Sequence, residues 1–441
     1  MSSSARIPRP TTIWMLVGLI LLTTNLRAAI TGISPVLGDL QDKFALSGVE
    51  VSLLTTLPVF CLGIFASVAP SFARWFGTEV VIAGALVMIT GGIVLRVVPS
   101  SPALFAGTVL AGAGIAMGNV LMPAVIKRHF ADRVGSLTGL AMMLMAASGA
   151  VAAGLAVPLD NAGGWRLALA VWAVPSLIAA IVWGPIALRS RPGREPSAPA
   201  AVATSAPAAV ATSAPGTVAA ETGSLLRSPL AWSVAVFMGM ASLMFYVLMS
   251  WLPEIMRDHG FAAAEAGMMV SSMMIIGIPL GFVVPVLAAR VRDQRFLVVG
   301  VSTAMVVGLI GMLLAPDAGW LWVTVLGLGT GSAFPLAFTL LTLRSPNPAV
   351  AARLSGMAQT GGYLLAGFGP LAVGVLHSVT GGWEVSLALL LALVVPETVF
   401  GLMAARPGFV RPSMMRPEGA FEQLIEPKDM PAPARVPANA R

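Results

Sequence analysis

The stretch TTIWMLVGLILLTTNLRAAITGISP at residues 11–35 contains a single charged side chain, that of Arg27. The hydrocarbon core of a bilayer is about 30 Å thick, and a helix that rises about 1.5 Å per residue crosses it in about 20 residues. Inside lipid the backbone has no water to bond, so the stretch must form a helix. We therefore expect a membrane-spanning helix here. Arg6 and Arg9 before it also fit a cleaved signal peptide, but the apolar stretch is too long for one.

Similar apolar stretches recur along all 441 residues, of which 57% are hydrophobic and 10% charged, with a mean hydropathy of +0.89. A soluble domain carries roughly a quarter charged residues, so lipid must cover most of the exterior of this chain. The sequence predicts an all-α membrane protein with twelve transmembrane helices. Their expected spans are 13–37, 49–73, 80–98, 103–125, 135–158, 165–188, 230–252, 262–289, 296–315, 319–342, 354–379 and 383–405.

The positions of the 26 lysines and arginines test this number of helices. With both termini in the cytoplasm, nearly all of them fall on the inner side, as the positive-inside rule requires. The formal charge of +7 therefore reflects topology and anionic inner-leaflet lipids, and we expect no nucleic-acid partner. We expect a multi-pass protein of the cytoplasmic (inner) membrane. The basic residues expected at the outer side are Lys43, Arg96, Arg166 and Arg257.

The two halves of the chain resemble each other. Trp14 matches Trp232 at an offset of 218, and LTGLA at 137–141 matches LSGMA at 354–358, with GGW following each. Matches of this kind in four pairs of segments indicate a duplicated six-helix unit. Two pseudo-symmetric six-helix bundles that both start inside are the arrangement of major facilitator transporters, whose substrate site lies between the halves.

The longest polar interruption contains AAVATSAP twice in tandem, at 200–207 and 208–215. This composition has little to bury and predicts a flexible tether, although a ligand-gated regulatory loop is an alternative. We expect an N-terminal half at 1–188, a flexible cytoplasmic linker at 189–229, a C-terminal half at 230–408 and a disordered cytoplasmic tail at 409–441.

Residues suited to catalysis or to metal binding are scarce. The only cysteine, Cys61, leaves no partner for an internal disulfide, and His129, His259 and His377 lie apart, near loops or span ends. No zinc-ligand or phosphate-binding motif occurs in the sequence. We expect no enzyme activity, no metal and no cofactor. The expected protein is a monomer whose partners are the lipid bilayer and a small-molecule substrate.

Arg27 is the main candidate for the substrate site. It lies well inside the first span, where an arginine costs at least about 2.5–3.5 kcal/mol on insertion scales. Its guanidinium must therefore meet a wet cavity, a partner or an anionic ligand. One interpretation is that Arg27 anchors the substrate, because the forked N–H donors of its guanidinium suit a carboxylate-like or heteroaromatic group. The other is a polar clamp between helices.

In the second half, Phe245 stands at the position of Arg27 and Tyr246 is next to it. This pairing predicts a lopsided cavity, with a cation from one half and aromatic faces from the other, which suits a small planar anion or polar ring. Further candidate substrate-binding residues also fit simple hydrogen bonds between helices. They are Asn25, Asn119, Gln359 and Tyr363.

Glu397 follows Pro396 and is the only carboxylate well inside a span. It is the candidate for proton coupling. The last helix of each half usually lies at the periphery of the major facilitator fold, which argues against this role.

Four motifs resemble the cyanate/nitroimidazole transporter family of the major facilitators. They are NLRAAITGISP at 25–35, GNVLMPAVIKRHF at 118–130, WLPEIMRDHG at 251–260 and the segment from GMAQTGG to GGW at 356–383. The resemblance covers nearly the whole chain apart from the linker and tail. It implies secondary transport of a small polar or anionic solute, with cyanate and nitroimidazoles as the named examples.

The loop after the second span, APSFARWFGTE at 69–79, is similar to the superfamily's Gly-xxx-Asp-Arg-x-Gly-Arg-Arg signature. Ala73 stands where that signature has aspartate, so the gating ion pair associated with the aspartate is in doubt. Arg74, and Arg290 in the second half, are the candidate gating-loop residues. The fifth span lacks the Gly-Pro pair of drug/proton antiporters.

These features predict a secondary active transporter that moves a small anionic or planar polar solute by alternating access. The alternative within the same fold is a multidrug exporter. A transporter-like sensor and a membrane enzyme are alternatives from other classes.

Overall fold

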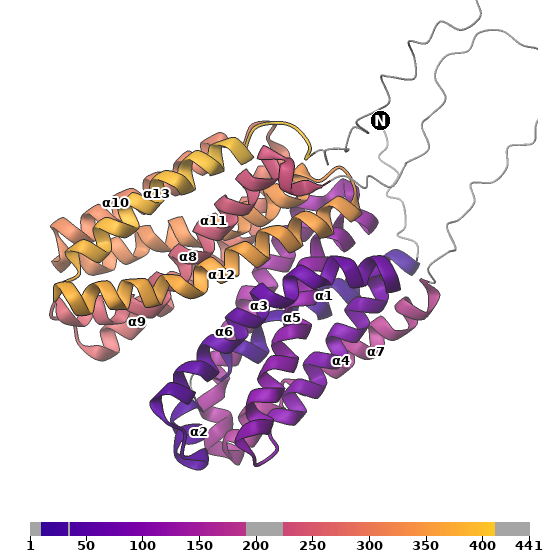
Figure 1. Ribbon diagram of the computed structural model, residues 1–441, viewed down its shortest axis with the longest axis horizontal. Coiled ribbons are helices and arrows are strands. Elements are labelled where there is room, and N and C mark those ends of the chain that lie inside the picture. Colours follow the sequence, from indigo (N-terminus) through magenta and orange to yellow (C-terminus); the bar gives the residue numbers. More distant parts are fainter. Residues whose placement is uncertain (1–9, 34–35, 191–223, 411–441) are drawn as a thin grey trace, which may run out of the picture.

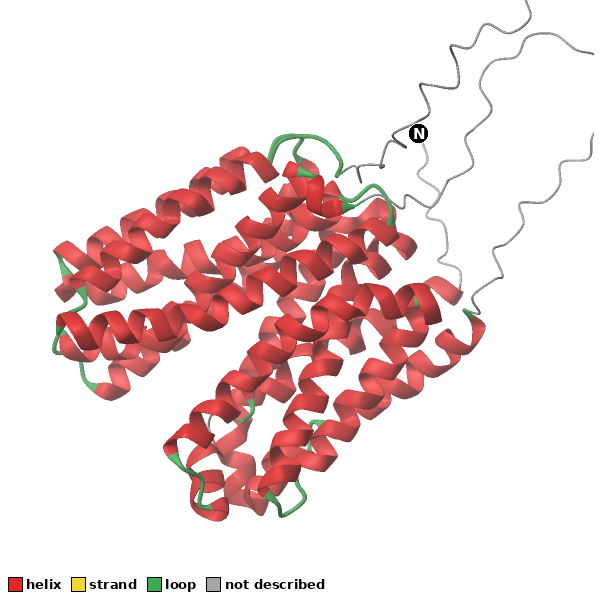
Figure 2. Ribbon diagram, in the orientation of Figure 1, coloured by secondary structure: helices red, strands yellow, loops and turns green. Residues whose placement is uncertain are grey.

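The computed structural model describes residues 10–33, 36–190 and 224–410. The regular elements in these ranges are helices (Figure 2), as long stretches with few charges require inside lipid. The helices are α1 Pro10–Thr31, α2 Leu37–Phe44, α3 Gly48–Phe76, α4 Thr78–Arg96, α5 Ser101–His129, α6 Val134–Ala170, α7 Ala173–Arg189, α8 Pro229–Asp258, α9 Ala263–Arg290, α10 Arg295–Leu314, α11 Gly319–Arg344, α12 Pro348–Thr380 and α13 Glu384–Ala404, with short 3-10 helices at Ala131–Arg133, Leu225–Arg227 and Pro316–Ala318.

Eleven stretches of the described chain are long and apolar enough to cross a bilayer. One of them, Ala131–Arg189, has 59 residues. At about 1.5 Å per residue this length is far more than one crossing needs. The backbone leaves helical geometry within it at Gly163 and at Gly164, whose φ is 73°. The stretch therefore contains two passes, and the expected number of twelve is reached.

The first span is shorter than predicted. We expected a helix over 13–37, but α1 ends at Thr31 and the chain continues into α2, whose sequence LGDLQDKF carries three charged residues. A helix end leaves carbonyl groups that need donors. Arg96 of α4 supplies one, because its Nη1 donates to the carbonyl of Ala29 at 2.5 Å and its Nε to Thr108 at 3.1 Å. Arg96, expected at the outer side, is the last residue of α4, but its side chain is buried against α1 and α5, with only 1% of it exposed.

Two bundles form the molecule, α1–α7 and α8–α13, and they lean together at one end (Figure 1). They meet where α3 packs on α12 and α6 packs on α9. Small residues allow this approach: a side chain at Gly135 would overlap Ala289 of α9, and one at Gly356 would overlap Pro70 of α3. These contacts bring together the end of α3, the end of α9 and the starts of α6 and α12, so the halves are closed at the end of the molecule that carries the start of α1.

The same polar contact recurs in both halves at this closed end. In the first half, Arg128 at the end of α5 pairs with Glu79 at the start of α4, with Nη1 to oxygen distances of 2.9 and 3.1 Å. In the second, Arg344 at the end of α11 donates to Gln294, just before α10. The offsets between the halves are 216 and 215 residues. This matching contact supports the duplication that the sequence predicted.

Most of the predicted linker and tail lies outside the described residues, at 191–223 and 411–441. Where the chain is described again, the 3-10 helix Leu225–Arg227 leads into α8, with Leu225 buried.

Arg344→Gln should destabilise the second half. Arg344 donates from Nε to the carbonyl of Ala404 at 2.9 Å and from Nη2 to that of Ala405 at 2.8 Å, so the end of α13 depends on it. Hydrogen bonds to charged groups contribute about 1.5–3 kcal/mol. We expect the melting temperature of the purified protein in detergent to fall by several degrees, while Arg295→Gln, at a half-exposed position, leaves it unchanged. Equal melting temperatures for the two variants would contradict this role.

Candidate functional site

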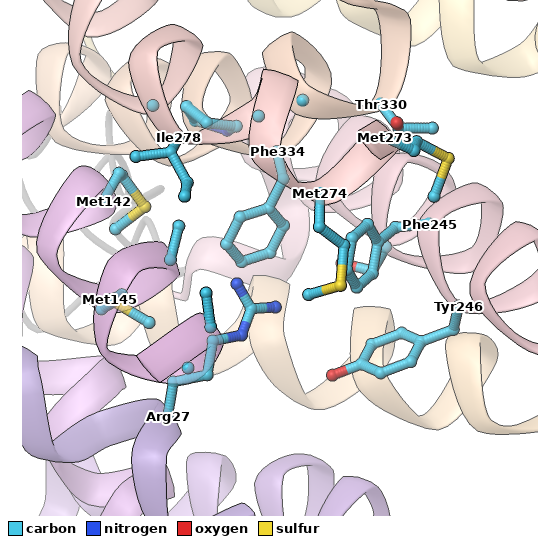
Figure 3. Close-up of a pocket in the computed structure, with 18 of the residues that line it drawn as sticks. Arg27, Met142, Met145, Phe245, Tyr246, Met273, Met274, Ile278, Thr330 and Phe334 are labelled. Carbon is cyan, nitrogen blue, oxygen red and sulfur yellow. The ribbon is translucent and has the colours of Figure 1, made fainter. Parts of the chain in front are cut away.

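A cavity of about 80 Å³ lies between the two bundles (Figure 3). Helices α1 and α6 of the first half and α8, α9, α11 and α12 of the second contribute its walls. It is lined by Arg27, Met142, Met145, Ala146, Gly149, Ala150, Ser242, Phe245, Tyr246, Met273, Met274, Gly277, Ile278, Gly281, Thr330, Gly331, Phe334, Pro335 and Tyr363.

Arg27 reaches this cavity because α6 leaves room for it. A Cβ atom at Gly149 would lie 3.2 Å from both Cγ and Cδ of Arg27, so the glycine accommodates the stem of the arginine. Thr31, one turn further along α1, donates from its hydroxyl to the carbonyl of Gly149 at 3.0 Å. Together these contacts fix the end of α1 against α6 and direct the guanidinium between the halves.

The guanidinium of Arg27 faces aromatic rings rather than an acid. Its Cζ lies 5.4 Å from the centroid of the Phe245 ring, within the range of a cation–π interaction. Figure 3 shows it projecting toward Phe334 and Met274, with the hydroxyl of Tyr246 directed to the same side. Among the described residues, no carboxylate lies within 4 Å of it. The charge therefore has no ionic partner within the described chain.

The other polar groups of the cavity are few. The hydroxyls of Ser242 and Thr330 each donate to a carbonyl of their own helix at 2.8 Å, so their hydrogens are already used. Tyr246 and the buried Tyr363 lie near enough to Arg27 to interact with it electrostatically. The guanidinium and the two phenols are thus the groups best placed to donate hydrogen bonds to a guest.

The structure brings together four of the seven residues that the sequence proposed for substrate binding: Arg27, Phe245, Tyr246 and Tyr363. The other three lie outside the cavity wall in this conformation. Asn25 donates from Nδ2 to the carbonyl of Leu21 at 2.7 Å and to that of Pro175 in α7 at 3.3 Å, so it joins two helices of the first half.

Asn119 and Gln359 are buried away from the cavity. Gln359 donates from Nε2 to the hydroxyl of Ser355, one turn earlier in α12, at 2.6 Å. The side-chain oxygens of both amides have no hydrogen-bond partner among the described residues.

The remaining predicted residues, Arg74, Arg290 and Glu397, do not line the cavity. Arg74 and Arg290 are exposed in the last turns of α3 and α9, at the closed end of the molecule. Glu397 is only 1% exposed in α13, and neither of its carboxylate oxygens has a hydrogen-bond partner within the described ranges. It lies one residue before Thr398, which donates to Ser302 of α10 at 2.8 Å.

The sequence analysis predicted the aromatic faces of Phe245 and Tyr246 but not the rest of the apolar lining. Met142, Met145, Met273 and Met274 border the cavity, and so does Phe334. The spacing of Met142, Met145 and Gly149 puts all three on the face of α6 that Arg27 meets. That shared face was the available signal. Polarizable methionine side chains adapt to guests of irregular shape.

Comparison with known proteins settles the family. The model of the Major Facilitator Superfamily matches residues 16–370. This chain belongs to the major facilitator superfamily. A 2-nitroimidazole transporter of Escherichia coli (strain K12) is 35% identical over 412 residues, which cover 93% of this chain and 100% of the relative. The cyanate transport protein CynX of the same organism is 29% identical over 372 residues, covering 84% and 91%.

These relatives confirm the resemblance to the cyanate/nitroimidazole transporter family, and they are transporters rather than enzymes. The crystal structure of the Escherichia coli fucose:proton symporter FucP (N162A) matches with a TM-score of 0.66 and 15% identity, covering 90% of this chain and 99% of that one. At this identity the match shows the fold alone, and it confirms the major facilitator architecture.

The carboxyl of Glu397, which has no hydrogen-bond partner among the described residues, predicts a measurable effect on stability. A buried polar group without a partner costs about 1–3 kcal/mol, so Glu397→Met, which replaces it with an apolar side chain of similar size, should raise the melting temperature by a few degrees. Glu254→Met, at an exposed position near the end of α8, is the matched control and should leave it unchanged. A clear fall in melting temperature for Glu397→Met would reveal that the carboxyl stabilises the fold through a partner.

Proposed function

We propose that this major facilitator moves a small anionic or planar polar solute across the cytoplasmic membrane by alternating access, with Arg27 as the anchor of the solute. The observation that carries the proposal is the guanidinium of Arg27, which lies between the two halves without an ionic partner among the described residues. Burying a charge without compensation is costly, and an anionic or strongly polar guest would supply the missing partner.

The dimensions of the cavity favour a small solute. One water needs about 10–15 Å³ of such space, so about 80 Å³ holds a handful of waters or a guest of a few heavy atoms. The names of two relatives specify 2-nitroimidazole and cyanate. Both molecules are small. The nitro group of 2-nitroimidazole presents two oxygens to which a forked guanidinium can donate two hydrogen bonds, and cyanate is an anion whose terminal oxygen or nitrogen can accept from the guanidinium.

The lining suits a guest with a polarizable frame. Phe245 and Phe334 offer ring faces, and four methionine thioethers complete the wall. A planar ring could stack on an aromatic face while its acceptor atoms meet Arg27. In this arrangement the first half supplies the charge and the second half supplies most of the apolar surface, so a bound solute would contact both halves at once.

Alternating access is supported by a site shared by two bundles whose contacts include the closed end and reach the middle of α3 and α12. The contacts of Gly135 with α9 and of Gly356 with α3 close the end at which most of the basic loop residues lie. The positive-inside rule assigns that end to the cytoplasm, with both termini inside. The described conformation would then be the one that receives solute from outside. Rocking of the halves about the cavity would open the closed end.

Glu397 is our candidate for proton coupling. Its carboxyl is buried and has no hydrogen-bond partner among the described residues, so a change in its surroundings would change how readily it gains or loses a proton, as coupling to a conformational change requires. Its place in α13, away from the cavity wall, means that any coupling would act through the packing of α13 rather than through contact with the solute.

Arg27→Gln should lower uptake of radiolabelled cyanate and 2-nitroimidazole into proteoliposomes by about 10- to 100-fold, because charge-assisted hydrogen bonds contribute about 1.5–3 kcal/mol. Arg27→Lys should retain part of the activity, since it keeps the charge but not the fork. Arg257→Gln, exposed near the end of α8, is the control and should transport normally.

Wild-type uptake by Arg27→Gln would refute the anchor. Loss of the folded protein in both Arg27 variants would favour the clamp between helices instead. Uptake of several unrelated cationic drugs by the wild type, with neither small probe transported, would favour the multidrug exporter.

Gly149→Leu tests the placement of Arg27 without removing it. The new side chain must displace the stem of the arginine, so uptake of the same two probes should fall at least about tenfold while the protein stays folded. Gly154→Leu lies on the same helix, where a Cβ atom meets nothing within 4 Å, and should transport within about twofold of the wild type. Equal rates for the two variants would show that the position of Arg27 does not limit transport.

A further inference from the structure

A second hollow lies on the outside of the molecule, along the seam between the halves. It runs between α3 of the first half and α8 and α12 of the second, and its volume is about 1170 Å³. This exceeds the about 300–1,000 Å³ of typical small-molecule pockets. The lining residues of this seam groove are Ser67, Pro70, Ser71, Arg74, Ser224, Leu225, Leu226, Trp232, Ala235, Val236, Gly239, Met240, Ala349, Arg353, Gly356, Met357, Thr360, Gly361 and Leu365.

The seam groove is charged at one end and apolar along the rest. Arg74 lies in the last turn of α3 and Arg353 in the second turn of α12, both at the closed end of the molecule. No acidic residue is among the lining residues. Trp232, 47% exposed, lies at the same end, in the first turn of α8. Further along, most of the wall consists of glycines and apolar side chains such as Leu365, which is 38% exposed, with Ser67 and Thr360 as the polar residues. A long apolar surface open to the outside of a membrane protein faces lipid.

The length of the seam groove matches one leaflet. From Arg353 to Leu365 the helix α12 advances twelve residues, or about 18 Å. Half of the about 30 Å hydrocarbon core is about 15 Å. A molecule with its charged group at the arginines and an apolar chain along α12 would therefore reach from the membrane surface to about the middle of the bilayer.

We propose that the seam groove binds one anionic phospholipid of the inner leaflet, with its phosphate at Arg74 and Arg353 and an acyl chain along α8 and α12. Charge complementarity selects this occupant, because basic pockets between helices at the cytoplasmic surface attract anionic headgroups. The parts of this chain outside the structure fit less well: residues 1–9, 191–223 and 411–441 each carry no net negative charge.

A lipid in this position would act on the equilibrium between conformations. Arg74 belongs to the first half and Arg353 to the second, so one phosphate would join the halves across the seam. The contact of Gly356 with Pro70, which closes this end of the molecule, lies on the wall of the same groove. The bound lipid would stabilise the conformation described here. Binding itself does not depend on which solute is transported, whereas its effect on transport rests on alternating access.

Native mass spectrometry of the purified full chain tests the binding step. We expect the protein to retain one phosphatidylglycerol in preference to phosphatidylcholine when both are supplied in equal amounts. Arg74→Gln together with Arg353→Gln should lower the bound fraction of phosphatidylglycerol about tenfold. Arg189→Gln, exposed at the end of α7, is the control for general surface charge and should bind like the wild type.

A second pair of variants tests the apolar part and leaves the arginines in place. A Cβ atom at Gly361 meets nothing within 4 Å, so Gly361→Phe can fill the seam groove without disturbing the packing of the helices. It should abolish selective retention of phosphatidylglycerol. Gly300→Phe on α10, where a Cβ atom is equally unobstructed, should leave retention unchanged.

Three outcomes would overturn the proposal: equal retention of the two lipids by the wild type, unchanged retention by Gly361→Phe, or unchanged retention by the double arginine variant. Inorganic phosphate provides the last comparison. Suppose that inorganic phosphate raises the melting temperature as much as phosphatidylglycerol does at the same concentration, and that Gly361→Phe does not change the rise caused by phosphatidylglycerol. The site then binds free anions and not a lipid.

Discussion

The structure is organised around the guanidinium of Arg27, a partly buried charge between the two halves that has no ionic partner among the described residues. Arg27 places this charge in a cavity whose walls are largely aromatic rings and thioethers. The cation–π contact with Phe245 offsets part of the cost of burial, but such contacts contribute only about 0.5–2 kcal/mol. A guest that brings negative charge or strong acceptor atoms would offset the rest of this cost. The free energy gained in this way would favour occupancy of the cavity.

The halves around that charge are held by contacts that are easily separated. Helices α3 and α12, and α6 and α9, approach at glycines and small residues, and among the described residues no ion pair joins the halves, so sliding or rocking breaks few strong interactions. Within each half, by contrast, arginines stabilise the helix ends: Arg128 with Glu79, Arg344 with the end of α13, and Arg96 with the end of α1. This distribution favours two rigid bundles with a movable interface, as alternating access requires.

Hydropathy and the placement of basic residues were sufficient to predict the fold, because the cost of burying backbone groups and charges in lipid leaves few alternatives. The end of α1 at Thr31 was not predicted. The carbonyl of Ala29 near this end accepts a hydrogen bond from Arg96, which lies 67 residues further along the sequence. A hydropathy window cannot detect such a partner.

The candidate site was predicted in part. Arg27 and Phe245 were recognised because a charge inside a span and its match in the repeat are visible in sequence. Asn25 and Gln359 were candidates because of their depth in the membrane, but Asn25 donates to a carbonyl of its own helix and to one of α7, and Gln359 donates to a hydroxyl of its own helix. The methionines of α6 and α9 were overlooked because the same residues serve as ordinary packing.

The most direct test is an experimental structure of the full chain with saturating 2-nitroimidazole. We predict density for the solute between the halves, with its nitro oxygens within about 3.2 Å of the Arg27 guanidinium and its ring against Phe245 or Phe334. Density for the solute at another place, or a carboxylate of the protein permanently bound to Arg27, would contradict the central role of this residue.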